Sequence, residues 1–244
     1  MSTEPSHSRI RISGLSVDVV RKDIRNLHLG VYPPDGRVRV AAPLSVGDEE
    51  VRLAVIDKLA WIRRQQACFA AQPRQSTRAM VNGESHYFLG RRYLLRVHEH
   101  DGAGRAELRG IRMLDLFARP DSSAEQRKAI LWRWYRAQLR AQLLPLVEKW
   151  QRKLGVVQLT DWRIKRMRTR WGGCNPETGR AWFNLELAKV SPACLDYIVL
   201  HELVHLIERQ HNDRFIALLD RHMPHWRQHR ELLNSTPLGD ELWR

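Results

Sequence analysis

The sequence has few cysteines and no long apolar segment. Its three cysteines, Cys68, Cys174 and Cys194, are odd in number and widely spaced, so they indicate no disulfide framework and fit a reducing compartment. Residues 1–8 are polar and lack the apolar core of a signal peptide. No apolar run reaches the roughly 18 residues that a membrane-spanning helix needs. We therefore expect a cytoplasmic protein that does not enter a membrane.

Acidic residues are also scarce relative to basic ones. The 244-residue chain has 41 Lys and Arg residues against 27 Asp and Glu residues, a formal net charge of +14. Residues 122–170 hold 13 of the basic residues and three of the acidic ones, a net charge of +10. Such a field favours a polyanionic partner, most simply nucleic acid, and the alternative is a basic surface without a specific ligand.

Apolar residues recur with the periods of both strands and helices. Alternation predicts strands over 27–31 and 38–42 within a segment, 9–42, that reads as strands throughout. It also predicts two short strands within 83–97 around Leu89-Gly90, and further strands over 105–116, 156–170 and 180–185. The turn sequence PPDG joins the first two strands into a hairpin. Spacings of three and four residues predict helices over 48–71 and 121–154, and Pro145 should kink or divide the second helix. The sequence therefore predicts an α+β fold.

One short pattern points to a metal. His201, Glu202 and His205 form the sequence H-E-x-x-H. Residues four apart lie on the same face of an α-helix, so His201 and His205 can bind one ion. Glu202 then lies beside the ion, where it can take a proton from a metal-activated water.

The residues around this pattern predict that it lies on a helix. Ser191 is a suitable N-cap, and Pro192 is a suitable first helical residue. Apolar residues then follow at spacings of three and four, namely Leu195, Ile198, Val199, Leu203 and Leu206. Two imidazoles and a carboxyl in so apolar a helix are costly to bury without partners, and a metal ion is one compensation. The alternatives are a buried His/Glu hydrogen-bond network and a partly exposed helix face.

A third histidine, His211, follows the first two in the spacing H-E-x-x-H-x5-H. This spacing matches the long zinc motif of the metzincins, except that Glu208 stands where those enzymes have Gly. That Gly lets the chain turn with positive φ, so here the turn must be made otherwise, with Asn212 as a residue that tolerates left-handed geometry. We prefer His211 as the third ligand because helix-breaking residues there separate two helical patterns. The alternative third ligands are Glu208, His222 and His225.

Several motifs, densest after residue 160, carry a resemblance to a known family. They are GESHYFLGRRY (83–93), WYRAQL (134–139), RTRWGGC (168–174), FNLEL (183–187), SPACLDYIVLHELVHL (191–206) and HNDRF (211–215). In these the chain resembles the YgjP-like metallopeptidases, whose broader relatives include the SprT-like and WLM-type zinc proteases. The chain departs from the usual family pattern at Gly173, Val204 and Asn212, and none of these changes removes a ligand or the general base.

The resemblance implies a Zn²⁺-dependent metallopeptidase of α+β fold. We expect a β-rich N-terminal part with helices over 1–120 and a zincin-like metallopeptidase part over 121–244, as two parts or one compact domain. The three histidines would bind Zn²⁺, and Glu202 would act as general base and then protonate the leaving amine. The expected substrate is a protein or peptide. The resemblance also implies an association with bacterial restriction-modification systems.

The main alternative is a nucleic-acid-binding accessory module in which zinc is structural. Structural zinc sites normally have four protein ligands, often cysteines, so three histidines with a glutamate beside them favour catalysis. The two functions can also coexist, because the relatives include proteases that act on proteins attached to DNA. Region 122–170 would then contact the nucleic acid.

Residues outside the metal motif are candidates for binding the substrate. Arg170 is a candidate oxyanion donor by its charge and by its place in the W-G-x-C loop. Asn184 is placed to orient either the metal helix or the peptide. The strand Arg180–Leu185 is expected to pair its edge with an extended peptide. Cys174 could reach the metal as an inhibitory ligand, whereas Cys194 is expected in the core.

Overall fold

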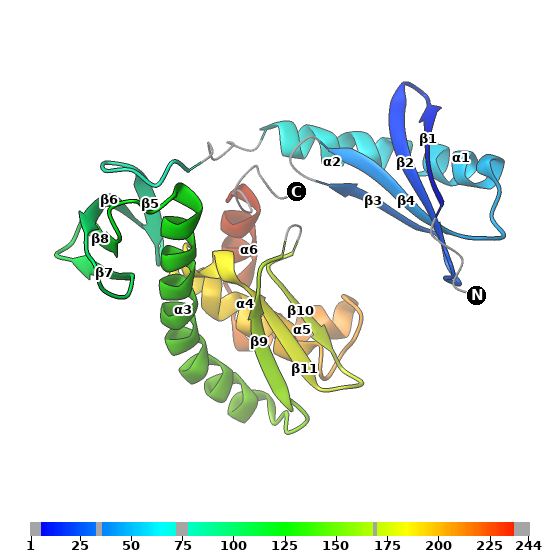
Figure 1. The fold of residues 1–244 in the computed structure, drawn as a ribbon. Coiled ribbons are helices and arrows are strands. Elements are labelled where there is room, and N and C mark those ends of the chain that lie inside the picture. The colour runs from blue at the N-terminus through cyan, green and yellow to red at the C-terminus, as the bar shows by residue number, and fades with distance from the viewer. Residues whose placement is uncertain (1–5, 33–35, 72–77, 168–169, 237–244) are drawn as a thin grey trace. The chain divides into compact units, whose positions relative to one another are not determined.

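The computed structural model describes residues 6–32, 36–71, 78–167 and 170–236 (Figure 1). The chain forms two compact units, Met1–Arg74 and Gln75–Arg244. Each unit has its own hydrophobic core. Both units combine helices with sheets, so the predicted α+β class is confirmed. None of the helices in the described residues is long and apolar enough to cross a membrane.

The first unit is a four-stranded sheet covered on one face by two helices (Figure 1). Its elements are β1 (Ser6–Ile12), β2 (Leu15–Lys22), β3 (His28–Tyr32), β4 (Arg37–Pro43), α1 (Asp48–Asp57) and α2 (Leu59–Ala71). The strand order is β1-β2-β4-β3, with β2 and β4 parallel and the other pairs antiparallel. Alternate strand residues such as Val19 and Val40 pack against Val55 and Ile62 of the helices.

Two details of this unit bear on the sequence predictions. The hairpin of β3 and β4 is confirmed, although its turn at 33–35 lies outside the described residues. The single helix predicted over 48–71 is two helices, because the chain leaves helical geometry at Lys58 (φ −96°, ψ 7°). Val51 and Val55 of the first helix and Ile62 of the second still share one core with the sheet.

The second unit begins with another four-stranded sheet. Its strands are β5 (Ser85–Phe88), β6 (Arg91–Glu99), β7 (Arg105–Arg109) and β8 (Met113–Ala118), in the order β5-β6-β8-β7. The strand predicted over 105–116 is therefore a hairpin, which turns at Gly110 with φ of 60°. The buried residues Leu95 and Leu116 share a core with Leu139 of the long helix that follows.

That shared core sets the boundary between the compact units. The sequence patterns placed a division at residues 120 and 121, after the second group of strands. In the structure the division falls between Arg74 and Gln75, because the β5–β8 sheet packs on the helix after it and has no separate core. The first unit alone is thus the separate β-rich part.

The long helix α3 (Ala124–Leu154) packs against β7 and β8 in the second unit. Ser123 caps its start by accepting a hydrogen bond from the Gln126 amide at 3.3 Å, and Gly155 ends it in the left-handed conformation with φ of 66°. The helix continues through Pro145 and curves rather than dividing (Figure 1). Its buried stripe includes Tyr135, Leu139, Leu143 and Trp150.

A three-stranded sheet and a group of short helices complete the second unit. Their bounds are β9 (Asp161–Lys165), β10 (Gly172–Asn175), β11 (Arg180–Asn184), the 3₁₀ helix η1 (Leu185–Ala188), α4 (Pro192–Val204), α5 (Asp213–His222) and α6 (Trp226–Ser235). The strand order is β10-β11-β9, with β11 antiparallel to β10 and parallel to β9. The prediction that Arg180–Leu185 offers a free edge is wrong, because β11 is paired on both sides. Within the described part of the chain, β9 and β10 are the two edge strands of this sheet, and each pairs only with β11.

Candidate metal centre

Helix α4 forms where its capping and apolar residues predict. Ser191 is the N-cap and accepts a hydrogen bond from the Cys194 amide at 3.4 Å, and Pro192 occupies the first turn. The helix ends at Val204, and His205 is the C-cap in near-helical geometry (φ −62°, ψ −18°). Because His205 keeps this geometry, it remains one turn beyond His201 on the same face.

The chain then turns back toward the helix without a glycine. The Glu208 amide donates a hydrogen bond to the Val204 carbonyl at 2.9 Å. All residues from His205 to Asn212 are described, and none of them has a positive φ. Asn212 is extended (φ −89°, ψ −175°) and caps α5 by accepting a hydrogen bond from the Phe215 amide at 3.1 Å. The predicted left-handed turn is therefore wrong, and Glu208 can replace the Gly of the metzincins without strain.

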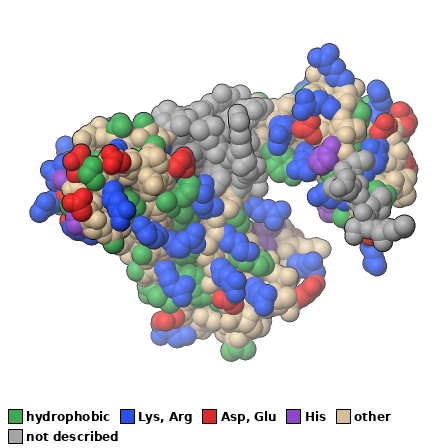
Figure 2. All heavy atoms as spheres, viewed as in Figure 1, with side chains coloured by type: hydrophobic (Ala, Val, Ile, Leu, Met, Phe, Trp, Pro, Cys, Tyr) green, Lys and Arg blue, Asp and Glu red, His purple; other side chains and the backbone are tan. Residues whose placement is uncertain are grey.

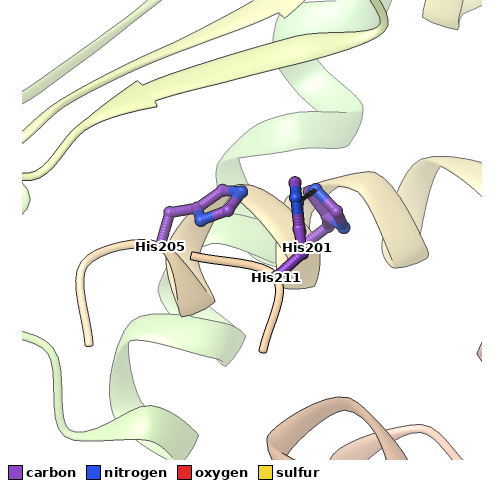
Figure 3. Close-up of side chains that lie close together, drawn as sticks. All are labelled: His201, His205 and His211. Atoms are coloured by element: carbon purple, nitrogen blue, oxygen red, sulfur yellow. Dashed lines mark hydrogen bonds between the residues drawn. The ribbon is translucent and has the colours of Figure 1, made fainter. Parts of the chain in front are cut away.

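This turn brings the three predicted histidines together. One ligand nitrogen from each of His201, His205 and His211 lies within 4.8 Å of the other two, and the three imidazoles face a common space (Figure 3). The Nε2 atoms of His201 and His211 are 3.1 Å apart. Zinc–nitrogen bonds of about 2.1 Å in a tetrahedral site would place ligand nitrogens ~3.4 Å apart. The three histidines thus fit a single ion.

The remaining ring nitrogens of two histidines are held by neighbours. His205 Nδ1 lies 3.2 Å from the Glu208 carbonyl, which can only accept, so Nδ1 carries the proton and Nε2 keeps its lone pair. The Tyr197 hydroxyl lies 3.4 Å from His201 Nδ1. The Phe215 ring packs against all three imidazoles, with ring centroids 4.7 to 5.0 Å apart. These contacts orient the rings toward the common space.

Burial sets the charge state of His201 and His205. It lowers the pKa of His201 to about 3, and the neighbouring His205 and His211 contribute in the same direction. Burial also lowers the pKa of His205. Neutral imidazoles have a free lone pair, so these side chains are in the form that binds a metal ion near neutral pH.

Glu202 lies beside the histidines and is 5% exposed. Burial raises the pKa of its carboxyl to about 8, and the positive charge of Arg170 acts in the opposite direction. A cation at the histidines would also favour the ionised carboxylate. Glu202 therefore has a pKa near the range in which a group can both accept and deliver a proton.

These side chains line a cavity of about 830 Å³. One wall is the edge strand β10, all four residues of which line the cavity. A Cβ atom on Gly172 would lie 2.7 Å from both Cγ and Cδ of Glu202, and closer still to Oε1. Only glycine leaves room for the Glu202 carboxyl at this point of the strand.

Comparison with known proteins assigns the family. The model of the YgjP-like family, described as a metallopeptidase domain, matches residues 25–236. The chain belongs to the YgjP-like metallopeptidase family. This assignment agrees with the convergence of the three histidines and the buried glutamate.

Two solved structures share a smaller region with this YgjP-like protein. The metallopeptidase zymogen of Pyrococcus abyssi abylysin is 17% identical, with a TM-score of 0.35 over 39% of this chain and 97% of that one. The metallopeptidase zymogen of Methanocaldococcus jannaschii jannalysin is 19% identical, with a TM-score of 0.34 over 36% of this chain and 90% of that one. A search of curated proteins found no significant match.

The other predicted site residues of the YgjP-like chain fall in different places. Arg170 is exposed and lines the cavity. Asn184 is fully buried, and its side-chain amide donates to the carbonyls of Met167 and Arg170 at 2.7 and 2.8 Å. Asn184 also accepts a hydrogen bond from the Glu186 amide at 3.2 Å. The structure thus does not bring Asn184 to the cavity. Instead, the Asn184 side chain holds the segment that carries Arg170 through these hydrogen bonds.

The cysteines stay apart from the histidine group. Cys174 lines the cavity, but burial raises its pKa to about 12, which keeps it a thiol rather than a thiolate ligand. Cys194 is buried as predicted, with its Sγ 3.7 Å from the His229 carbonyl. The side chain of Cys68 lies outside the described residues.

The alternative third ligands also lie apart from the histidine group. The Glu208 carboxylate accepts a hydrogen bond from the Gln210 amide, His222 packs edge-on against Trp150, and His225 precedes α6. Two features of the site were missed. Tyr197 is one helical turn before His201, a spacing that signals contact, but Gly172 could be recognised only from the packing of β10 on α4.

Proposed function

We propose that the chain is a zinc-dependent peptidase that hydrolyses peptide bonds of a protein substrate. The observation that carries this proposal is the convergence of three imidazoles next to a buried carboxyl in one cavity. Three histidine ligands leave one coordination position open, which is the arrangement of catalytic rather than structural zinc. Zinc would supply a Lewis acid that lowers the pKa of water and polarises the scissile carbonyl.

The chain's own residues supply the proton transfer. Glu202 accepts a proton on its carboxylate from the attacking water and delivers it to the leaving amine. Its carboxyl is almost fully buried beside Gly172, and the positive charge of Arg170 acts on it. Arg170 is the positive side chain that we assign to the developing oxyanion, because it lines the cavity and its charge acts on Glu202.

The substrate would lie along β10. This strand has one edge paired with β11, and its residues line the cavity next to Glu202. An extended peptide can pair with such an edge through main-chain hydrogen bonds, which gives binding with little sequence preference. A protein substrate would therefore need an unfolded or extended segment.

A single pair of measurements tests the peptidase proposal. Purified protein should contain about one zinc per chain, and Glu202→Gln should keep that zinc but lose cleavage of an unfolded protein by about 10²–10⁴-fold. His211→Ala should instead lose both zinc and cleavage. If Glu202→Gln cleaves as well as the wild type, the assignment of the general base is wrong.

A second function, nucleic-acid association, is favoured by the surface of α3 and β9. Arg136, Arg140 and Lys165 are exposed there, and Lys and Arg side chains gather over these elements (Figure 2). The Arg140 guanidinium lies 5.1 Å from the Trp162 ring centre, and the Lys165 ammonium lies 4.3 Å from that of Trp182. Such a surface would bind phosphates without reading sequence. Absence of affinity for DNA or RNA at low salt would exclude it.

A nucleic-acid-binding module with structural zinc would behave differently in the same assays. It would bind nucleic acid and keep its zinc, but it would show no cleavage that depends on Glu202. The cleavage assay with Glu202→Gln therefore separates this alternative from the peptidase.

A further inference from the structure

Within the described residues of the first unit, one face of the sheet is covered by no helix of that unit. Helices α1 and α2 pack on the face that carries Val19 and Val40, and alternation sends the intervening side chains to the other face. That open face carries Arg9, Arg11, Tyr32, Arg37 and Arg39. Asp18 is the only acidic residue in the four strands. The face is therefore strongly basic, and it belongs to a different unit from the metal centre.

The register of the strands arranges part of this face in a row. Arg9 lies opposite Asp18, Asp18 opposite Arg39, and Arg39 opposite Gly30, so the row crosses all four strands. Four strands spaced about 4.8 Å apart span roughly 14 Å. This is the width over which a four-stranded sheet binds two or three nucleotides.

An aromatic ring lies on the same face. A Cβ atom on Gly30 would lie 2.8 Å from Tyr32 Cε2 and 2.9 Å from the Tyr32 hydroxyl, so the ring rests over the bare backbone of Gly30. Tyr32 is 37% exposed in this position. An exposed ring that rests on a sheet beside arginines is a surface on which an unpaired base can stack.

Asp18 does not neutralise all the arginines of this face. Asp18 pairs with Arg9 at 2.8 Å and approaches Arg37 at 3.7 Å. Within the described residues, Arg11 and Arg39 have no carboxylate partner. A hollow of about 440 Å³ on this face is lined by Arg9, Arg37 and Arg39, and Asp18 and His7 also form part of its wall. Phosphate groups suit such a hollow, because guanidinium groups form bidentate hydrogen bonds with them.

We propose that this open sheet face binds single-stranded nucleic acid, with a base stacked on Tyr32 and backbone phosphates paired with Arg11 and Arg39. A single strand fits better than a duplex, since a duplex hides the base faces that would stack on the ring. The inference does not depend on the peptidase chemistry. It is also distinct from the basic surface of α3 and β9.

The test measures binding of the full chain to labelled oligo(dT) and oligo(rU) of about 15 nucleotides. Tyr32→Ala should weaken binding about tenfold or more, whereas Tyr32→Phe, which keeps the ring, should bind nearly as the wild type does. Paired substitution of Arg11 and Arg39 by Ala should reduce the slope of log affinity against log salt by about 1.4. The matched control replaces Arg63 and Arg64 of α2, which removes the same charge from the opposite side.

Three outcomes would overturn the proposal. They are equal binding by Tyr32→Ala and wild type, equal effects of the Arg11/Arg39 and Arg63/Arg64 pairs, and binding of a duplex as tight as that of the single strand. A loss confined to substitutions at Arg136 and Arg140 would assign binding to the α3 and β9 surface instead. The comparison of dT with rU identifies DNA or RNA as the preferred strand. The Tyr32 variants should keep wild-type cleavage, so failure here and failure of the peptidase proposal are separable.

Discussion

Replacing Gly172 by Ala should disable the proposed general base while leaving the metal ligands in place. The added methyl group would lie 2.7 Å from Glu202 Cγ and Cδ, whereas uncrowded carbon contacts begin near 3.5 Å. Glu202 must therefore move by close to 1 Å. The three histidines are contributed by α4 and the turn after it, and the three atoms nearest to the new methyl group all belong to Glu202.

The size of the effect follows from this displacement. A shift of about 1 Å in a catalytic group can cost roughly 10²-fold in rate. The folding cost should be smaller, about 1–3 kcal/mol for an overpacked site, because the Glu202 side chain can rotate away. We therefore expect kcat/KM to fall about 100-fold while zinc content and the folded state persist.

The neighbouring Gly173 provides a matched control. A Cβ atom there would lie 3.7 Å from Trp182 Cε3, which is an ordinary contact. Gly173→Ala makes the same change in the same strand without crowding Glu202, so its cleavage should stay close to the wild-type rate. Both variants are compared by steady-state cleavage of an unfolded protein and by zinc analysis. Equal activities of the two variants would refute the role of Gly172, as would parallel loss of zinc and activity in Gly172→Ala.

Three further substitutions test other contacts. Asn184→Ala leaves the two carbonyls that accept from its amide without this partner. The free energy of unfolding, measured by urea titration, should therefore fall by roughly 2–4 kcal/mol. A loss under about 1 kcal/mol would contradict this expectation. Tyr197→Phe removes the hydroxyl 3.4 Å from His201 and should weaken zinc affinity about tenfold in chelator competition, and unchanged affinity would exclude a supporting role. Burial lowers the pKa of His86 to about 3. Below pH ~6.5 this histidine therefore binds a proton in the unfolded chain but stays neutral in the folded chain. Between about pH 7 and about pH 5 the wild type should therefore lose roughly 2 kcal/mol more stability than His86→Gln, and equal losses would show that His86 is protonated when folded.

Local sequence signals predicted the parts of the site that depend on helix geometry. Ser191 and Pro192 mark the start of α4, and the four-residue spacing places His201 and His205 on one face whatever surrounds the helix. The third histidine was also predicted by its spacing, but the turn before it was not. The turn uses a hydrogen bond from the Glu208 amide to the Val204 carbonyl and ordinary backbone angles. Because many residue types allow these angles, the sequence does not predict such a turn.

Features that depend on packing between distant segments could not be predicted. The strand Arg180–Asn184 is apolar enough for either an edge or a central strand, and only its pairing with both β9 and β10 decides. Asn184 could face a ligand or the core, and its full burial appears only when the segment near Arg170 folds over it. The boundary between the two units could not be predicted either, because it depends on which helix covers the β5–β8 sheet.

The strand β10 joins the two tasks that the proposed peptidase must perform. Its free edge is where an extended peptide would pair, and its Gly172 is the residue that leaves room for Glu202. A peptide paired with β10 would pull on the same backbone that fixes the carboxyl, so substrate binding and the position of the base are mechanically linked. The position of β10 is in turn held by β11, whose last residue, Asn184, donates to the Arg170 carbonyl. Misplacement of any of these residues should therefore lower the cleavage rate more than it weakens zinc binding.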